Sequence, residues 1–519
     1  MPRFNLVQKI YKNNLLIYIV AALTVAYIVY LAFSIHEGIF YAGDQALKSL
    51  EVKQIAAGYG FKYLHLAQPE WVQEIWKAGY FPLKPPFFYP SPSGYIIVYP
   101  PMFQIISSFF YSAFGSSGLY ILPLLCTFVL LTWMVVLLKR TGATALNIAV
   151  SMFILVFCSP LILYGVMFWE HLPTVLLLFV GVAFLAKTPS GIAPAAVLGL
   201  IAGQAIWLRP EALMMNFLYC VAAGILFLRR RDAAYIAFVA AIALSLIPWL
   251  IFNKVEYGSF FGIHGMQVLS DKNPETTIGW KNGIRNLLAI NRLSLRCFLF
   301  ILFLFPILYR IVRWRQAADL RLPLLAGIVI VYSLATPFML PNDGVIQWGP
   351  RYFLAIIPVT VVALSLAETK WNLFARWNVP WWLTVLMLYA GYNSFVHNTH
   401  GGGYNELRWR YNQRLTSIYN LINSKPGNVV IVSDHVMTYD LGYLFDKDYF
   451  FTGSGDDSLR RLIPLLKSHG VRQFIYVFDP HIPSLPAMLQ DSTTRQYFID
   501  ATNKAHPRED MIAKVYTIQ

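Results

Sequence analysis

The residues best suited to chemistry in this sequence stand where long apolar runs begin or end. There are four such groups: Asp44, Glu170 with His171, Arg209 with Glu211, and Arg351 with Tyr352. A carboxylate can take a proton from a reacting hydroxyl or amine, and a guanidinium can hold a phosphate through two parallel hydrogen bonds. Each group could instead have a purely structural role. Asp44 could cap a helix, Glu170 and His171 could form a polar turn, Arg209 and Glu211 could form an ion pair, and Arg351 could anchor a span at the interface. Which reading applies depends on where the apolar runs place the four groups.

The apolar runs have the length and composition of membrane spans. The chain has 519 residues, of which 57% are hydrophobic and 13% charged, whereas soluble domains average about 25% charged residues. Run 15–34 is the first, and at about 1.5 Å per residue it is long enough to cross a hydrocarbon core of about 30 Å. Arg3, Lys9 and Lys12 precede it, as they would a signal peptide. The run exceeds the roughly 7–15 apolar residues of such a peptide, so we expect an uncleaved anchor.

Lys and Arg residues follow every second apolar run, and this alternation orients the spans because cytoplasmic loops are rich in these residues. Runs that end at a basic loop are 119–138, 172–186, 214–228, 294–309 and 352–366, and the returning runs are 146–166, 193–208, 233–252, 322–340 and 381–396. With the first run, this predicts eleven spans in the cell (inner or plasma) membrane, a cytoplasmic N-terminus and an extracytoplasmic C-terminus. All four polar groups then lie on the extracytoplasmic face, where they avoid the roughly 2.5–3.5 kcal/mol that a charge in hydrocarbon costs.

This arrangement of the spans leaves residues 35–118 as one large outer loop. Its stretch 95–114 is apolar enough to be a further span, and counting it as one would move the next basic loops to the outside. Pro100-Pro101 and the polar Gln104 favour instead a helix that lies on the membrane surface.

The apolar runs stop after residue 396. Residues 397–424 are polar and aromatic, which predicts a linker, and residues 425–519 predict a small α/β domain outside the membrane. Within that domain 428–432 and 473–478 are strand-like, and 457–469 has helical periodicity with Asp456 as its candidate cap. The predicted fold is a polytopic α-helical membrane domain over 1–396, with about eleven transmembrane helices, followed by this small domain.

Charge and cysteine content argue against several other classes of protein. The formal net charge is +15, but Lys and Arg lie between apolar runs and form no single soluble patch. The expected surroundings are therefore membrane lipids, and no nucleic-acid partner is expected. Four cysteines fall in or beside apolar runs without CxxC spacing: Cys126, Cys158, Cys220 and Cys297. This pattern supports neither a disulfide framework nor a zinc site.

In order and sidedness, the polar groups resemble those of the GT-C superfamily, in particular the branch related to protein O-mannosyltransferases and aminoarabinose transferases. Gly43-Asp44-Gln45 matches an acidic position after the first span of that family, and Glu170 matches a second one at the outer turn between the third and fourth spans. Many bacterial members carry an Arg-Pro-Glu segment like 209–211 and a Gly-x-Arg-Tyr segment like 349–352. The Pro-rich outer loop is also similar, and the resemblance covers about residues 10–400.

One position departs from the family pattern. Many members have Asp-Glu in the first motif, where this chain has Asp44-Gln45. A metal site built from that second carboxylate is therefore not expected, and no cofactor is predicted.

The resemblance implies a glycosyltransferase that moves a sugar from a polyprenyl-phosphate donor to an acceptor glycan, lipid or protein on the extracytoplasmic face. Asp44 would take the acceptor proton, and Glu170 would orient the acceptor or Arg209. Arg351 is the first candidate to bind the donor phosphate, because a guanidinium fork matches phosphate. The other substrate-binding candidates are Tyr352, Arg209, Glu211, His171, Lys84 and His264, and aromatic walls for sugar stacking are Trp169, Trp207 and Trp348.

Two other functions would use similar residues. A flippase or transporter for lipid-linked sugars needs the same cations and aromatic residues, but the chain shows no pair of matching halves, which many transporters have. An O-antigen ligase or polymerase uses similar donors, but its large outer loop usually comes late in the chain and not after the first span. A mere anchor for the C-terminal domain would need only one span.

Overall fold

The computed structural model describes residues 14–34, 40, 43–83, 88–91, 94–189, 191–263, 280–305, 307–308, 320–340, 351–371, 381–399, 414–424, 427–478, 496–497 and 512–518. By its internal contacts the chain forms two compact units. We call them the helical unit (Met1–Phe33 and Tyr120–Asn405) and the loop–sheet unit (Ser34–Leu119 and Glu406–Gln519).

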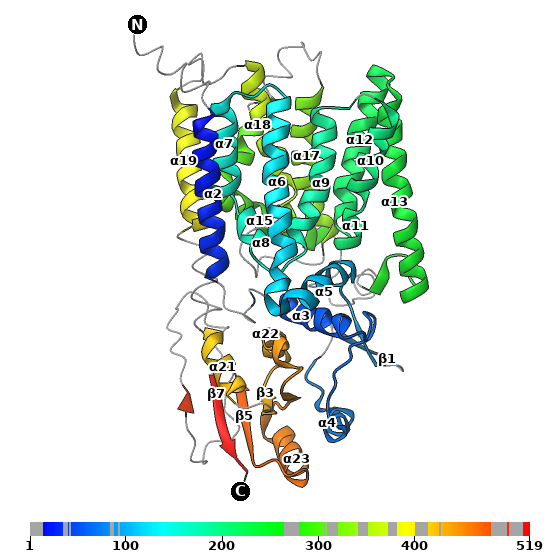
Figure 1. Ribbon diagram of the computed structural model, residues 1–519, viewed down its shortest axis with the longest axis vertical. Helices are drawn as coiled ribbons and strands as arrows, with labels where there is room; N and C mark the ends of the chain where they lie inside the picture. The colour runs from blue at the N-terminus through cyan, green and yellow to red at the C-terminus, as the bar shows by residue number, and fades with distance from the viewer. Residues whose placement is uncertain are drawn as a thin grey trace. The chain divides into compact units, whose positions relative to one another are not determined.

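The helical unit is a bundle whose long helices run side by side (Figure 1). Its elements are α2 (Leu15–Phe33), α6 (Ile121–Arg140), α7 (Ala145–Phe157), α8 (Leu161–Gly165), α9 (His171–Ala186), α10 (Ile192–Gly203), α11 (Ala205–Leu208), α12 (Ala212–Arg230), α13 (Ala233–Tyr257), α15 (Trp280–Cys297), η3 (Leu299–Phe303), α17 (Arg321–Ala335), η4 (Thr336–Met339), η5 (Arg351–Phe353), α18 (Ile356–Trp371) and α19 (Trp381–Thr399). Small residues let some helices approach closely, as in membrane bundles generally. A Cβ on Gly199 or Gly203 of α10 would collide with α13.

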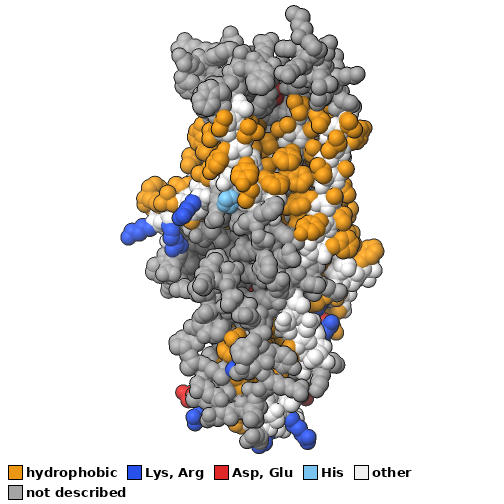
Figure 2. All heavy atoms as spheres, turned by 90° about the vertical axis from the view of Figure 1, so that its left-hand side faces the viewer, with side chains coloured by type: hydrophobic (Ala, Val, Ile, Leu, Met, Phe, Trp, Pro, Cys, Tyr) orange, Lys and Arg blue, Asp and Glu red, His pale blue; other side chains and the backbone are white. Residues whose placement is uncertain are grey.

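Within the described residues, five helical stretches are long and apolar enough to cross a membrane: Leu15–Phe33, Met102–Arg140, Ala212–Arg230, Ala233–Tyr257 and Arg321–Met339. Shorter apolar helices cover Ala145–Phe157, His171–Ala186 and Ile192–Leu208. On the face drawn in Figure 2, hydrophobic side chains gather over the described helices of the bundle. The predicted membrane bundle is confirmed in kind, and the count of eleven spans stays a prediction.

Several of the expected spans are not single continuous helices, among them 146–166 and 294–309. In run 146–166, α7 ends at Phe157, and Ser159 and Pro160 separate it from α8. Proline has no N–H for the helical hydrogen-bond ladder, which explains the break. In run 294–309, α15 ends at Cys297, where Phe298 leaves the helical region with φ −151 and ψ 72 before η3 begins.

The C-terminal part of the loop–sheet unit holds a five-stranded mixed sheet in the order β4-β3-β5-β7-β6. β3 pairs in parallel with β4 and with β5, and β7 pairs antiparallel with β5 and β6. The elements are α21 (Arg414–Asn423), β3 (Val429–Val432), α22 (His435–Asp440), η7 (Gly442–Leu444), β4 (Tyr449–Thr452), α23 (Gly455–Ser468), β5 (Gln473–Phe478), β6 (Gln496–Tyr497) and β7 (Ile512–Thr517).

The strand predictions at 428–432 and 473–478 are confirmed by β3 and β5, and the helix prediction at 457–469 is confirmed by α23. The predicted cap at Asp456 is wrong. The helix begins at Gly455 after Ser454, so Asp456 lies inside its first turn. A carboxylate is still favourable there, because the first turn carries the positive end of the helix dipole.

The first outer loop contributes the remaining elements of the loop–sheet unit: α3 (Gly43–Ala56), α4 (Glu70–Ile75), η1 (Trp76–Tyr80), β1 (Phe88–Ser91), β2 (Gly94–Ile97), α5 (Met102–Phe114) and η2 (Gly115–Tyr120). Val72 and Ile75 of α4 are buried in the same hydrophobic core as β3, β5 and α23. The indole N–H of Trp76 donates to the carbonyl of Phe450 at 2.8 Å. The sequence assigned 35–118 to the membrane domain, whereas the contacts group this loop with the C-terminal sheet.

Helix α5 buries Gln104, Ser107 and Ser108 together with Phe103, and exposes two phenylalanines further along. Gln104 and Ser107 are fully buried, whereas Phe109 is 72% exposed and Phe114 is 62% exposed. This distribution is the reverse of that on a helix at the surface of a soluble protein. That 95–114 lies on the membrane surface and is not a further span stays a prediction.

Candidate active site

Arg209 is the centre of a polar cluster inside the helical unit. Its Nη1 donates to Glu170 Oε1 at 2.9 Å, and its Nη2 donates to Glu211 Oε1 at 2.8 Å. The same Nη1 lies 2.8 Å from Nε2 of His171. The Arg209 side chain is only 14% exposed and that of Glu170 only 8%. Two carboxylates therefore hold one guanidinium in a fixed orientation away from bulk water.

The local sequence explains why these groups meet. Glu170 is the residue before α9, Glu211 is the residue before α12, and Arg209 lies in extended conformation between α11 and α12. Because α11 and α12 both pack against α9, the starts of α9 and α12 come together. A helix N-terminus carries partial positive charge, which stabilises a carboxylate at that position.

Aromatic rings fix the histidine of this cluster. The rings of Trp169 and His171 pack edge to face with centroids 4.4 Å apart, and the ring of Tyr164 stacks on Trp169 at 5.3 Å. All three residues are at least 98% buried. The imidazole is therefore held beside Arg209 by rigid neighbours.

The late motif joins the same cluster through Tyr352. The guanidinium carbon of Arg209 lies 5.8 Å from the centre of the Tyr352 ring, and that of Arg351 lies 5.0 Å from it. Nη2 of Arg351 also donates to the Tyr352 hydroxyl at 3.1 Å. Tyr332 of α17 donates its own hydroxyl to the Tyr352 carbonyl at 3.0 Å, which fixes the backbone. Two guanidinium groups thus share one aromatic ring, and Arg209 is the one whose charge is compensated by two carboxylates.

We name the six residues that meet here the Arg209 cluster: Glu170, His171, Arg209, Glu211, Arg351 and Tyr352. The sequence placed all six on one face, and the structure brings them into one contact network. Sequence reasoning did not single out Tyr332 or Tyr164, which lie within apolar stretches and look like core residues.

Asp44 belongs to the other unit. It lies in the first turn of α3 and is half-buried. Its neighbours Gln45, Lys48 and Glu51 are buried along the same helix. The sequence did not predict this buried polar face, because residues 43–56 were read only as part of a large loop.

Four other candidates differ in outcome. Lys84, His264 and Trp348 lie outside the described residues. Trp207 packs on Phe252 with ring centroids 5.3 Å apart.

Across the part of the chain that the structure describes, no group of three or more His, Cys, Asp or Glu residues is placed to hold a metal ion.

The chain is similar to known proteins in fold, whereas the sequence comparisons found no match. No protein-family model matches the chain, and no curated protein matches it by sequence. The solved structures that match it in fold include ArnT from Cupriavidus metallidurans bound to undecaprenyl phosphate, and the same protein in the apo state. Each has a TM-score of 0.56 at 12% sequence identity, and the match covers 95% of this chain and 97% of that protein. The resemblance to the aminoarabinose transferase branch is therefore confirmed for the fold, and this chain has the fold of ArnT.

Proposed function

We propose that this protein is a multi-pass membrane glycosyltransferase that transfers a sugar from a polyprenyl phosphate to an acceptor on the extracytoplasmic face. The observation that carries the proposal is the Arg209 cluster, set within a fold shared with ArnT. One of the ArnT structures has undecaprenyl phosphate bound, which supports a donor of that chemical class.

The proposed reaction is a displacement at the anomeric carbon of the donor sugar. An acceptor hydroxyl or amine forms a bond to that carbon, and the bond from the carbon to the phosphate oxygen breaks with its electron pair leaving on the phosphate. The acceptor proton passes to a carboxylate, for which we propose Asp44. Such a base typically contributes about 10²–10⁴-fold. The transition state resembles an oxocarbenium ion, as in glycoside hydrolysis.

The Arg209 cluster suits the leaving group. Negative charge grows on the phosphate as the sugar departs, and fixed cations lower the energy of that state. We propose that Arg351 binds the phosphate with a guanidinium fork beside Tyr352. Glu170 and Glu211 hold Arg209 in place and compensate its charge, so Arg351 is the cation that we propose for the phosphate.

The direct test is incubation of the purified protein with a panel of radiolabelled donors. The panel contains undecaprenyl phosphate linked to mannose, glucose, galactose or aminoarabinose, and both transfer and hydrolysis are scored. We expect at least one donor to release undecaprenyl phosphate with the sugar moved to an acceptor or to water. Movement of intact donors across proteoliposomes, with no cleavage of any, would favour the flippase instead.

Substitution of Arg351 by lysine separates phosphate binding from a structural role. Lysine keeps the charge but loses the bidentate fork. We expect kcat/KM for the donor to fall by at least about tenfold, which corresponds to about 1.4 kcal/mol of transition-state binding. Steady-state kinetics with the best donor of the panel would measure the change.

The control for this substitution is Arg229→Lys. Arg229 is an exposed arginine in the last turn of α12, at the end of that helix away from Glu211. This variant should leave both kinetics and melting temperature unchanged. Retained activity with a lowered melting temperature in Arg351→Lys would assign Arg351 a structural role, and the donor phosphate would have to bind elsewhere.

A further inference from the structure

Helix α3 carries Asp44 in its first turn and Lys53 in its last, and contacts fix its two ends differently. Asp44 is half-buried at the start of the helix. Beyond it α3 is buried on most sides, including Leu47, Leu50 and Val52. The contacts along α3, including those of its last turn, therefore set where its first turn lies.

Lys53 is fastened to the C-terminal part of the same unit. Its Nζ lies 2.9 Å from Oδ1 of Asp446 and donates to the carbonyl of Tyr443 at 2.7 Å. The ammonium also lies 3.6 Å from the centre of the Tyr443 ring. The Lys53 side chain is only 9% exposed. An ion pair, a charge-assisted hydrogen bond and a cation–π contact thus meet on one ammonium group, which makes this a specific attachment and not a solvated surface pair.

The opposite side of α3 is held by the first outer loop. Gln104 of α5 donates its Nε2 to Oε2 of the fully buried Glu51 at 2.8 Å. Gln54 donates to the carbonyls of Gly60 and Tyr63, both at 2.9 Å, and its Oε1 accepts from the amide of His65 at 3.0 Å. The loop fixes how α3 is rotated, and Lys53 ties its last turn to the segment 443–446.

We propose that Lys53 is a positioning residue for the transfer reaction and that the C-terminal domain, through Tyr443 and Asp446, sets the placement of Asp44. The proposal rests on the proposed function, because it takes Asp44 as the base. Nine positions separate Lys53 from Asp44, which is about 13.5 Å along a helix axis. A tilt of about 5° at Lys53 would then move Asp44 by about 1 Å, and a misplacement of that size can cost about 10²-fold in rate.

Two variants test this directly, Lys53→Met and Asp446→Asn. With the best undecaprenyl-phosphate sugar of the panel, we expect each to lower kcat by at least about tenfold while the KM for the donor changes by less than about twofold. Lys53→Arg keeps a cation with several N–H donors and should retain most of kcat. The matched control is Lys77→Met, an exposed lysine of the same unit, which should behave as wild type.

Coupling to Asp44 distinguishes positioning from general destabilisation. If Lys53 acts through Asp44, then Lys53→Met added to Asp44→Asn should lower the residual rate no further, since residues that act together are not additive. Two outcomes would overturn the positioning role while leaving Asp44 as the base. One is a double variant whose rate loss is the product of the two single losses, and the other is a kcat for Lys53→Met equal to that of Lys77→Met. Wild-type turnover by Asp44→Asn itself would overturn both proposals. Should Lys53→Met fail to fold by size-exclusion chromatography, Asp446→Asn, whose side chain is 39% exposed in the wild type, carries the test.

Discussion

Replacing Asp44 by asparagine is expected to lower sugar transfer by at least about 100-fold, the minimum for loss of a general base. Asparagine has nearly the same shape but cannot accept the proton of the attacking hydroxyl or amine. Binding of undecaprenyl phosphate and the melting temperature should stay close to those of the wild type, because the side chain is half-buried at a helix start and not in a core. Steady-state transfer assays and lipid-binding titrations would measure the two effects separately.

The matched control is Asp457→Asn. Asp457 is an exposed carboxylate in the first turn of α23, within the same unit, so it reports the general effect of removing such a charge. A rate for Asp44→Asn above about a tenth of the wild-type rate would exclude Asp44 as the base. Loss of lipid binding in parallel with loss of transfer would instead assign Asp44 to donor binding.

Replacing Arg209 by methionine is expected to abolish transfer and to lower the free energy of unfolding by about 3–5 kcal/mol. In the wild type the guanidinium bonds to both Glu170 and Glu211. The substitution removes it, so the two carboxylates are left without the cation that compensates their charge. Removing one partner of a buried ion pair is strongly destabilising, because the remaining charge is uncompensated. Denaturant titration of the protein in detergent would measure the change.

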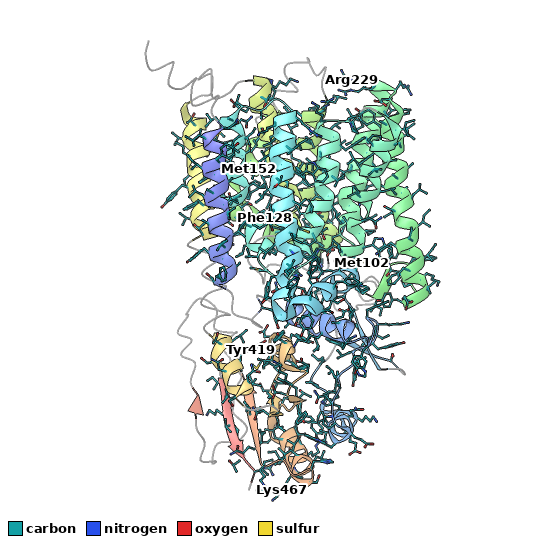
Figure 3. All side chains as sticks on the ribbon, viewed as in Figure 1. Met102, Phe128, Met152, Arg229, Tyr419 and Lys467 are labelled. Carbon is teal, nitrogen blue, oxygen red and sulfur yellow. The ribbon has the colours of Figure 1, made fainter. Side chains whose placement is uncertain are left out.

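A second variant separates charge from packing. Adding Glu170→Gln and Glu211→Gln to Arg209→Met removes the uncompensated charges, so most of the lost stability should return while transfer stays absent. Equal stability of the single and triple variants would mean that packing around Arg209, and not its ion pairs, accounts for the loss. Arg229→Met is the control, since Arg229 is exposed at the opposite end of α12 (Figure 3).

The Arg209 cluster was largely predictable from sequence, because charged residues at the ends of apolar runs are excluded from hydrocarbon and must lie near one membrane face. Alternation of the basic loops put the segments at 170, 209 and 351 on one face, and helices in a bundle bring their ends together. The ring of Tyr352 between two arginines could not be predicted, since it depends on how α17 and the segment after Arg351 pack. Tyr332 was missed for the same reason.

The loop–sheet unit was much less predictable. Strands β3 and β5 are continuous apolar runs, whereas β7 carries Lys514 between buried Ala513 and partly buried Val515 and has no clear alternation. Periodicity also cannot show that α4, with Val72 and Ile75, completes a core built about 350 residues later in the chain. Only long-range packing decides that pairing, and a six-residue helix gives too short a pattern to reveal its partner.

The bond from Trp76 to Phe450 joins residues 374 positions apart. A ribosome that adds about 5–20 residues per second needs about 20–75 s to make that intervening chain. For this interval the segment 70–80 has been synthesised but its packing partner has not. Trp71 and Trp76 must therefore wait with their apolar surface exposed, so this segment of the nascent protein needs protection until the last part of its sheet has been synthesised.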